Sequence, residues 1–333
     1  MDPNDPLHKV VNAFFGPQPT VTRKQCDDLA VALVGGIVIP TSIQGAFSYT
    51  VMAGPNLTRI VQFRVHDSVL NMMAVSLAQM IHPQLVPACT YHGKLGGSSP
   101  FLVYVMEKLC GFSWFRVRSL WNLPTGPPPM NLVSRRRNTA VDLARYFAAS
   151  WNCRPAVLSN AVEATYHDLM QKLELLSQAL PSRFMDSLRR VRAELPLLFA
   201  PTYPLVLSHG DLSEFNIYVD VNTGHLTGII DWAEACILPF GISLWSLENI
   251  LGHMDARGWH YYDNHHMLGD LFWQTFEEAV GGVSEADRQA IRVARMVGFF
   301  LRYGFVRENG VRLLPAKESD SRLRYLDTFC MTI

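Results

Sequence analysis

The spacing of apolar residues differs between the first hundred residues and the rest of the chain. Residues 37–107 hold short runs in which apolar and polar positions alternate. That two-residue period predicts β-strands. From residue 131 onward, apolar residues mostly recur at intervals of three and four, which predicts helices. We therefore expect a strand-rich part over residues 1–107 and a mainly helical part over residues 108–333.

In the first part, the pattern predicts two short helices, a sheet and one further helix. The short helices cover 6–15 and 21–34, and Gly35-Gly36 ends the second. Strands flank a turn near Gln44-Gly45 and recur over 58–65, 86–93 and 101–111. Residues 68–83 predict a helix whose apolar face consists of Leu70, Met73, Leu77 and Met80.

The second part opens with a predicted break in regular structure over residues 111–131, which is rich in proline and glycine. Helices are predicted over 131–151, 162–180, 182–195, 244–251, 267–280 and 285–303. The basic run Arg135 to Arg137 is expected to be a solvated helix face. Residues 252–267 are rich in aromatic residues and histidine, and we expect a loop there.

The most informative stretch is residues 205–232, where two apolar strands each lead into polar residues. The first strand leads into His209-Gly210-Asp211, and Asn216 follows five positions later. The second strand, from Leu226, ends on Asp231 after a turn at Asn222-Thr223-Gly224. The amide oxygen of Asn216 and the carboxylate of Asp231 are hard oxygen ligands suited to Mg²⁺. Asp211, on a loop after a strand, can meet a substrate hydroxyl.

This spacing, H-x-D-x-x-x-x-N followed by a strand-terminal Asp, is the catalytic-loop and metal-binding pattern of the protein-kinase fold. Here the motifs are HGD and DW, and this variant resembles the aminoglycoside phosphotransferase (APH) and choline-kinase group of small-molecule kinases. The resemblance implies an α+β, bilobal protein-kinase-like fold, with a small antiparallel-sheet N-lobe and a larger, mainly helical C-lobe. It implies transfer of the γ-phosphate of ATP or GTP, with Mg²⁺, to a small-molecule hydroxyl. Asp211 would orient or deprotonate that hydroxyl, while Asn216 and Asp231 would hold the metal.

The resemblance also assigns nucleotide contacts to the N-terminal lobe. Arg64 falls where a kinase places its phosphate-binding lysine, and a guanidinium can hold a phosphate bidentately. Ser48 lies near the loop that would cover the phosphates. The hinge, whose backbone would bind the purine edge, corresponds to Met106, Glu107 and Leu109.

Two departures from the family pattern keep a second hypothesis open. The helix over 68–83 has no Glu to orient Arg64, and a single Gly45 stands where protein kinases carry several glycines. The alternative is therefore a catalytically inactive ligand-binding or scaffold protein with the same fold. A further alternative is an enzyme that phosphorylates a hydroxyl in order to eliminate it.

The remaining residues around the motif have supporting or acceptor roles in this interpretation. His209 is expected to bond backbone near Asp231 and hold the loop, Ser213 to approach the γ-phosphate, and Glu214 to face solvent. Acidic residues are sparse in the last third of the chain, so we predict a neutral or aromatic acceptor and not a polycation. The candidate acceptor pocket consists of Trp114, Trp232, Trp259 and Tyr261, although Trp114 could equally pack the linker onto its lobe.

Composition limits the classes of protein that this chain can be. Lys and Arg total 29 and so do Asp and Glu, so nothing favours a nucleic-acid or membrane-surface partner. The start of the chain lacks the features of a signal peptide, and the six cysteines are scattered. We therefore expect a cytoplasmic protein with reduced thiols, and a monomer. The four histidines between 253 and 266 fit no zinc-binding spacing.

Overall fold

The computed structural model describes residues 6–17, 21–121, 131–308 and 312–330. The chain divides into two compact units, Met1–Cys110 and Gly111–Ile333. The division falls three residues from the boundary expected from the sequence. Each unit has its own core, and the two are described in turn.

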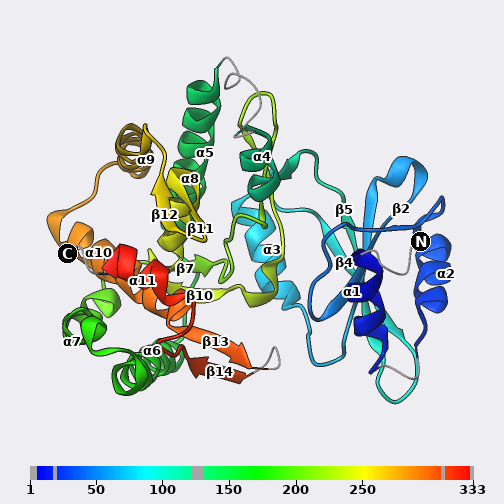
Figure 1. Ribbon diagram of the computed structural model, residues 1–333, viewed down its shortest axis with the longest axis horizontal. Helices are drawn as coiled ribbons and strands as arrows, with labels where there is room; N and C mark the ends of the chain where they lie inside the picture. The colour runs from blue at the N-terminus through cyan, green and yellow to red at the C-terminus, as the bar shows by residue number, and fades with distance from the viewer. Residues whose placement is uncertain (1–5, 18–20, 122–130, 309–311, 331–333) are drawn as a thin grey trace. The chain divides into compact units, whose positions relative to one another are not determined.

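The first unit is built on a five-stranded antiparallel sheet in the order β1-β2-β3-β5-β4. Its strands are β1 (Ile39–Pro40), β2 (Ser48–Ala53), β3 (Arg59–Arg64), β4 (Cys89–Leu95) and β5 (Phe101–Glu107), with a 3₁₀ turn at Pro55–Leu57. Helices α1 (Pro6–Phe15) and α2 (Arg23–Val34) pack on β2 (Figure 1). Val51, Phe63 and Phe101 of the sheet are fully buried in the resulting core. Both predicted helices and the predicted sheet are therefore present.

Helix α3 (Met72–Ile81) is present, but its predicted apolar face is only half right, because Leu70 is buried and Leu77 half-buried while both methionines are exposed. Its buried residues are Ala74, Val75 and Ala78, whereas Met73 is 82% exposed and Met80 is 67% exposed. Small side chains allow a helix to approach its neighbours closely. The prediction followed the largest side chains, and methionine tolerates exposure because it is flexible.

The second unit is mainly helical. Its helices are α4 (Trp114–Trp121), α5 (Leu132–Asn152), α6 (Ser159–Ala179), α7 (Met185–Glu194), α8 (Glu248–Leu251), α9 (His265–Val280), α10 (Glu285–Tyr303) and α11 (Leu323–Cys330). Short 3₁₀ segments lie at Ser182–Phe184, Leu195–Phe199, Trp232–Glu234 and Ile242–Leu247. α5 packs along α9, and α10 packs on the 3₁₀ segment Ile242–Leu247. The long helices follow the predicted ranges closely.

Short antiparallel pairs of strands complete the second unit. β7 (Leu205–Ser208) pairs with β10 (Cys236–Pro239), and β8 (Ile217–Val219) lies between β6 (Phe112–Ser113) and β9 (Leu226–Ile229). The remaining pairs are β11 (Gly252–Asp255) with β12 (Gly258–Tyr261), and β13 (Phe305–Glu308) with β14 (Arg312–Pro315). The loop on which Asp211 lies therefore starts from one ladder and ends in another.

Three predictions for this unit are corrected. The expected break at 111–131 begins with β6 and helix α4, because Trp114, Val117 and Trp121 form a buried helical face, and residues 122–130 lie outside the described part. The expected loop at 252–267 contains the β11–β12 hairpin, in which His253 pairs with His260. The basic run on α5 is only partly solvated, because the Arg136 guanidinium lies 3.7 Å from the centroid of the Tyr262 ring.

Two general findings concern the whole described chain. None of its helices combines the length and apolarity that crossing a membrane requires. All six cysteines are free thiols. The cytoplasmic location stays a prediction.

Candidate active site

The loop from Ser208 to Asn216 is fixed at its start by a sharp turn at Gly210. This residue has φ +79°, and a Cβ placed on it would lie 2.4 Å from the carbonyl oxygen of Glu234. Only glycine fits this close approach with positive φ. The turn presses the loop against the segment that follows Asp231, so residues 210 and 234 are neighbours.

His209 joins the two halves of the motif. Its Nε2 lies 2.9 Å from the carbonyl oxygen of Ile230, and its Nδ1 accepts the backbone N–H of Asp211 at 3.2 Å. Since Nδ1 accepts, the neutral ring carries its proton on Nε2 and donates it to Ile230. Burial lowers the pKa of His209, and the Ile230 carbonyl and the charges of Asp231 and Asp211 only partly oppose this. The bond to backbone beside Asp231 that the sequence led us to expect is present.

Asn216 brings the loop and the second strand together. Its Nδ2 donates to the backbone carbonyl of Asp211 at 2.8 Å and to the Asp211 carboxylate oxygen Oδ2 at 3.2 Å. Its own backbone carbonyl accepts the N–H of Ile230 at 3.0 Å. Asp211 and Asn216 are thus in contact, and Asp231 follows directly on a residue bonded to both His209 and Asn216.

The other carboxylate oxygen of Asp211 has a partner that the sequence did not indicate. Nη1 of Arg302, at the end of α10, lies 2.8 Å from Asp211 Oδ1 in an ion pair. Arg302 lies 91 residues beyond Asp211 in the sequence and outside any recognised spacing. The apolar periodicity that predicts this helix carries no information about a charged partner for Arg302.

Asp231 stands in the left-handed region, with φ +62° and ψ +65°. Its side chain is exposed, and within the described chain it has neither a hydrogen bond nor an ion pair. The Asn216 amide oxygen is likewise not engaged by any described donor. Two hard oxygen donors on adjacent backbone, without protein partners, fit a Mg²⁺ site.

Three further residues of the motif can now be placed. Ser213 is buried, and its backbone N–H donates to the Asp211 carbonyl at 2.8 Å. Glu214 does not face solvent as predicted, because it forms an ion pair with Arg118 of α4. Burial raises the pKa of Glu214 and Arg118 opposes that shift. Sequence reasoning missed this pair because α4 lies in a stretch predicted to be irregular.

The four aromatic residues proposed for an acceptor pocket do not all gather in one place. Trp114 is fully buried and its Nε1 donates to the Asn249 carbonyl at 2.6 Å, which fits the packing alternative. Trp232 is also buried, with its Nε1 bonded to the carbonyl of Ile229. Trp259 and Tyr261 lie together, with ring centroids 5.9 Å apart.

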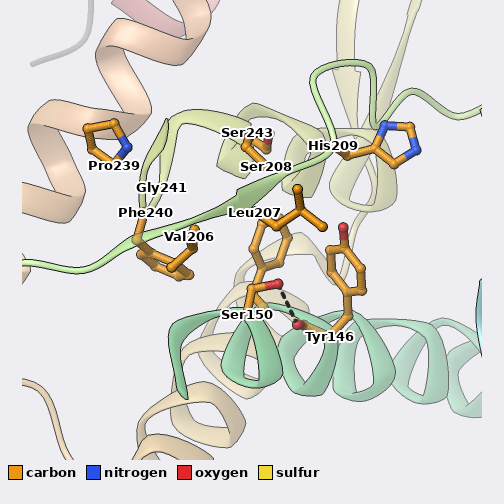
Figure 2. A pocket seen from close by; sticks show the side chains of 11 residues that line it. Tyr146, Ser150, Val206, Leu207, Ser208, His209, Pro239, Phe240, Gly241 and Ser243 are labelled. Atoms are coloured by element: carbon orange, nitrogen blue, oxygen red, sulfur yellow. Dashed lines mark hydrogen bonds between the residues drawn. The ribbon is translucent and has the colours of Figure 1, made fainter. Parts of the chain in front are cut away.

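Tyr261 lines a cavity of about 550 Å³ between α7, α10 and α11. Its hydroxyl donates to the carboxylate of Glu248, which is 2% exposed and also forms an ion pair with Arg295. Cavities of this size can hold small molecules. A second cavity, of about 10 Å³, lies between α5 and the β7–β10 ladder beside His209 (Figure 2). Its volume is that of about one water molecule.

In the first unit, Arg64 ends β3 and is buried. Its Nε and Nη2 donate to the backbone carbonyl and hydroxyl of Ser68 at 2.8 and 2.6 Å, and its Nη1 donates to Gln62 at 3.1 Å. Ser48 is the register partner of Arg64 on β2, and its hydroxyl accepts from Gln62 at 3.3 Å. Arg64 and Ser48 therefore share one polar cluster with Gln62 and Ser68.

The predicted hinge begins at the end of β5 and continues beyond it. Met106 and Glu107 are still paired within the sheet, and the N–H of Glu107 donates to the Ala88 carbonyl at 3.2 Å. The N–H of Leu109 has no backbone partner within the described chain. Of the three hinge residues, Leu109 therefore has a donor available to a ligand.

A sequence model described as the phosphotransferase enzyme family, APH, matches residues 59–263. The chain belongs to the APH phosphotransferase enzyme family. The matched range contains Arg64 and the whole of the 205–232 motif, whereas Arg302 lies beyond it. No curated protein matches the chain.

Solved structures show the same fold. A macrolide 2′-phosphotransferase type I aligns with a TM-score of 0.52 and 17% identity, over 86% of this chain and 92% of that one. The streptomycin–ATP–APH(2″)-IIa ternary complex aligns with a TM-score of 0.50 and 16% identity, over 87% of this chain and 93% of that one. At these identities the similarity establishes the kinase-like fold of an APH protein, as the sequence predicted.

Proposed function

We propose that this APH protein transfers the γ-phosphoryl group of ATP or GTP to a hydroxyl group of a small molecule. The observation that carries the proposal is the pair of hydrogen bonds that Asn216 Nδ2 donates to Asp211, together with the hydrogen bond from the Ile230 N–H to the Asn216 carbonyl. These hydrogen bonds join the carboxylate of Asp211 to the amide of Asn216, and they join Asn216 to the residue that directly precedes Asp231. Phosphoryl transfer depends mainly on such positioning.

In the proposed reaction, the acceptor oxygen forms a bond to the γ-phosphorus while the bond from that phosphorus to the β,γ-bridging oxygen breaks. The electron pair of the broken bond leaves with the nucleoside diphosphate. Asp211 accepts the hydroxyl hydrogen bond, aims the oxygen at the phosphorus and takes its proton. His209, Ser213 and Asn216 hold the Asp211 backbone and so fix the direction of the carboxylate.

Asn216 Oδ1 and the Asp231 carboxylate would hold Mg²⁺, which, when bound, neutralises charge on the nucleotide phosphates. In the N-terminal unit, Arg64 and Ser48 would contact phosphate oxygens and the N–H of Leu109 would meet the purine edge. The APH(2″)-IIa complex, named for ATP and streptomycin, supports a nucleotide donor and a small-molecule acceptor.

The acceptor is proposed to be neutral or aromatic and not a polycation. Three carboxylates beside the loop are already paired with arginines, namely Asp211 with Arg302, Glu214 with Arg118 and Glu234 with Arg307. A stacked aromatic pair lies next to them, formed by Phe115 and Phe215 with centroids 4.6 Å apart. Both rings are more than a third exposed, so a planar ligand can reach them.

The test combines nucleotide binding with turnover. We expect Mg²⁺ with ATP or GTP to raise the melting temperature of the wild type and not of Asp231→Asn. A library of hydroxyl compounds, read by mass spectrometry for a gain of one phosphoryl group, should give a product with the wild type and none with Asp211→Asn. Normal phosphorylation by both variants would refute the assignment. A product that has lost its hydroxyl would indicate phosphorylation followed by elimination.

One observation favours a second candidate, a non-catalytic ligand-binding protein. Helix α3 has no acidic residue, and the Arg64 guanidinium is held by Ser68 and Gln62. If a nucleotide binds without any transfer to the library or to water, this second candidate is favoured.

A further inference from the structure

Arg302 forms an ion pair with Asp211, and most of its guanidinium N–H groups have no partner within the described chain. Its guanidinium forms the 2.8 Å ion pair with Asp211 and lies 4.5 Å from the centroid of the buried Trp245 ring. Within the described chain it has no further hydrogen-bond partner. A guanidinium has five N–H donors in a planar fork. Since 27% of its side chain is exposed, a ligand can reach the remaining donors.

A second arginine lies next to it. Nη1 of Arg322 donates to the backbone carbonyl of Phe305 at 2.6 Å, and Phe305 is only three residues beyond Arg302. No carboxylate of the described residues lies within ion-pair distance of the Arg322 guanidinium. Burial lowers the pKa of Arg322, and the positive charges of Arg302 and Arg307 add to that effect against Asp320. The local charge is therefore positive and incompletely neutralised.

A third arginine, Arg307, is paired with a residue that lies beside the catalytic loop. Arg307 on β13 pairs with Glu234, whose backbone touches Gly210. Of these three arginines, Arg302 pairs with Asp211 and Arg307 with Glu234, whereas Arg322 forms no ion pair within the described chain.

We propose that Arg302 and Arg322 form an oxyanion-binding site beside Asp211, and that its ligand is the phosphoryl group in transfer. This rests on the proposed function. During transfer, negative charge spreads over the equatorial oxygens of the γ-phosphorus. A guanidinium next to the attacking oxygen stabilises that charge and can bind two oxygens at once. Arg302 would then be a catalytic residue, and Arg322 would supply the second cation.

The first test measures binding of inorganic phosphate by calorimetry, without any acceptor. We expect Arg302→Gln and Arg322→Gln each to weaken phosphate binding by about tenfold, the effect of losing a hydrogen bond to a charged group. Arg292→Gln is the matched control, because it removes an exposed arginine from the same helix, α10. Asp211→Asn should bind phosphate more tightly than the wild type, since it removes the anion that competes for Arg302.

Equal binding by Arg302→Gln and Arg292→Gln, or no phosphate binding by the wild type, would overturn the site. Melting curves confirm that each variant is folded. Arg302→Lys keeps the charge and should recover only part of the affinity, because an ammonium cannot bind two oxygens in a fork.

The second test identifies the source of the oxyanion. Phosphate binding is repeated in the presence of Mg²⁺ with either a nucleoside diphosphate or the imido analogue of ATP or GTP. The diphosphate should leave phosphate binding intact, and the analogue should abolish it because its terminal group fills the site. Phosphate that still binds beside the analogue would overturn the phosphoryl assignment and give the site to an acidic group of the acceptor.

This design separates the two proposals. If no nucleotide binds while phosphate binding still depends on Arg302, the proposed function and the phosphoryl source fail and the oxyanion site stands. If nucleotide binds and is turned over equally by Arg302→Gln and Arg292→Gln, the catalytic role of Arg302 fails and the proposed function stands.

Discussion

Nε2 of His209 lies 2.9 Å from the carbonyl oxygen of Ile230, so one imidazole ring ties the loop of Asp211 to the strand that ends on Asp231. The ring is buried and its second nitrogen is occupied by the Asp211 N–H. His209 is therefore a positioning residue, and the acid–base chemistry of the loop belongs to Asp211.

We expect the protein to lose stability as the pH falls below 6.5, the ordinary pKa of histidine, partly through His209. Burial lowers its pKa in the folded state, so between the two pKa values the unfolded chain binds the additional proton and is favoured. Free energies of unfolding at about pH 8 and about pH 5 should differ less in His209→Gln than in the wild type. His92→Gln, at an exposed site on β4, is the control. An unchanged pH dependence in His209→Gln would contradict this account.

The left-handed backbone of Asp231, with φ +62°, should lower the free energy of unfolding of the protein. Glycine accepts this conformation and alanine does not, so Asp231→Gly should be more stable than Asp231→Ala by about 1 kcal/mol. Both variants lack the carboxylate and should lose Mg²⁺-dependent nucleotide binding alike. Urea unfolding gives the stability difference, and equal midpoints would show that the backbone at 231 relaxes.

Gly210→Ala should destabilise the protein by at least about 2 kcal/mol, since it adds a methyl group to a positive-φ residue in a crowded site. That methyl carbon would lie 2.4 Å from the Glu234 carbonyl oxygen. Gly269→Ala makes the same change inside helix α9, where nothing lies within 4 Å, and should stabilise by about 0.5–1 kcal/mol. Thermal melts of the two variants should therefore shift in opposite directions.

The buried carboxylate of Glu248 should be costly to leave unpaired. Arg295→Met removes its ion-pair partner and should destabilise by about 3–5 kcal/mol. The double variant Glu248→Leu, Arg295→Met replaces the whole pair with apolar side chains and should recover most of that loss. A double-mutant cycle in denaturant measures this coupling, and additive effects would show that the pair is not coupled.

The sequence predicted most of the fold because its long helices carry strong periodic signals. The stripe over 162–180 and that over 285–303 have large apolar residues on their buried faces, and both helices end within a few residues of the expected positions. The buried face of α3 was predicted in part wrongly, because Ala74 and Ala78 are buried and the two methionines are exposed. α4 was missed because the prolines that follow it dominated the pattern.

The site residues that are close together in the sequence could be predicted from their spacing, whereas the ion pairs between distant residues could not. His209, Asp211 and Asn216 lie within eight positions of one another, so a motif could locate them together. Arg302 reaches Asp211 across about ninety residues, and Arg118 reaches Glu214 across 96. Such ion pairs depend on how helices pack and leave no periodic trace in the chain. Roles for the acceptor residues could not be inferred for the same reason.

The side-chain amide of Asn216 has an NH₂ group and an oxygen, and only the NH₂ group bonds to Asp211. An aspartate in its place would offer oxygen at both ends, repel the neighbouring carboxylate and let the loop drift from its partner strand. Asn216→Asp would therefore uncouple two tasks, the gathering of a cation and the aiming of a hydroxyl, that a single planar group now performs together.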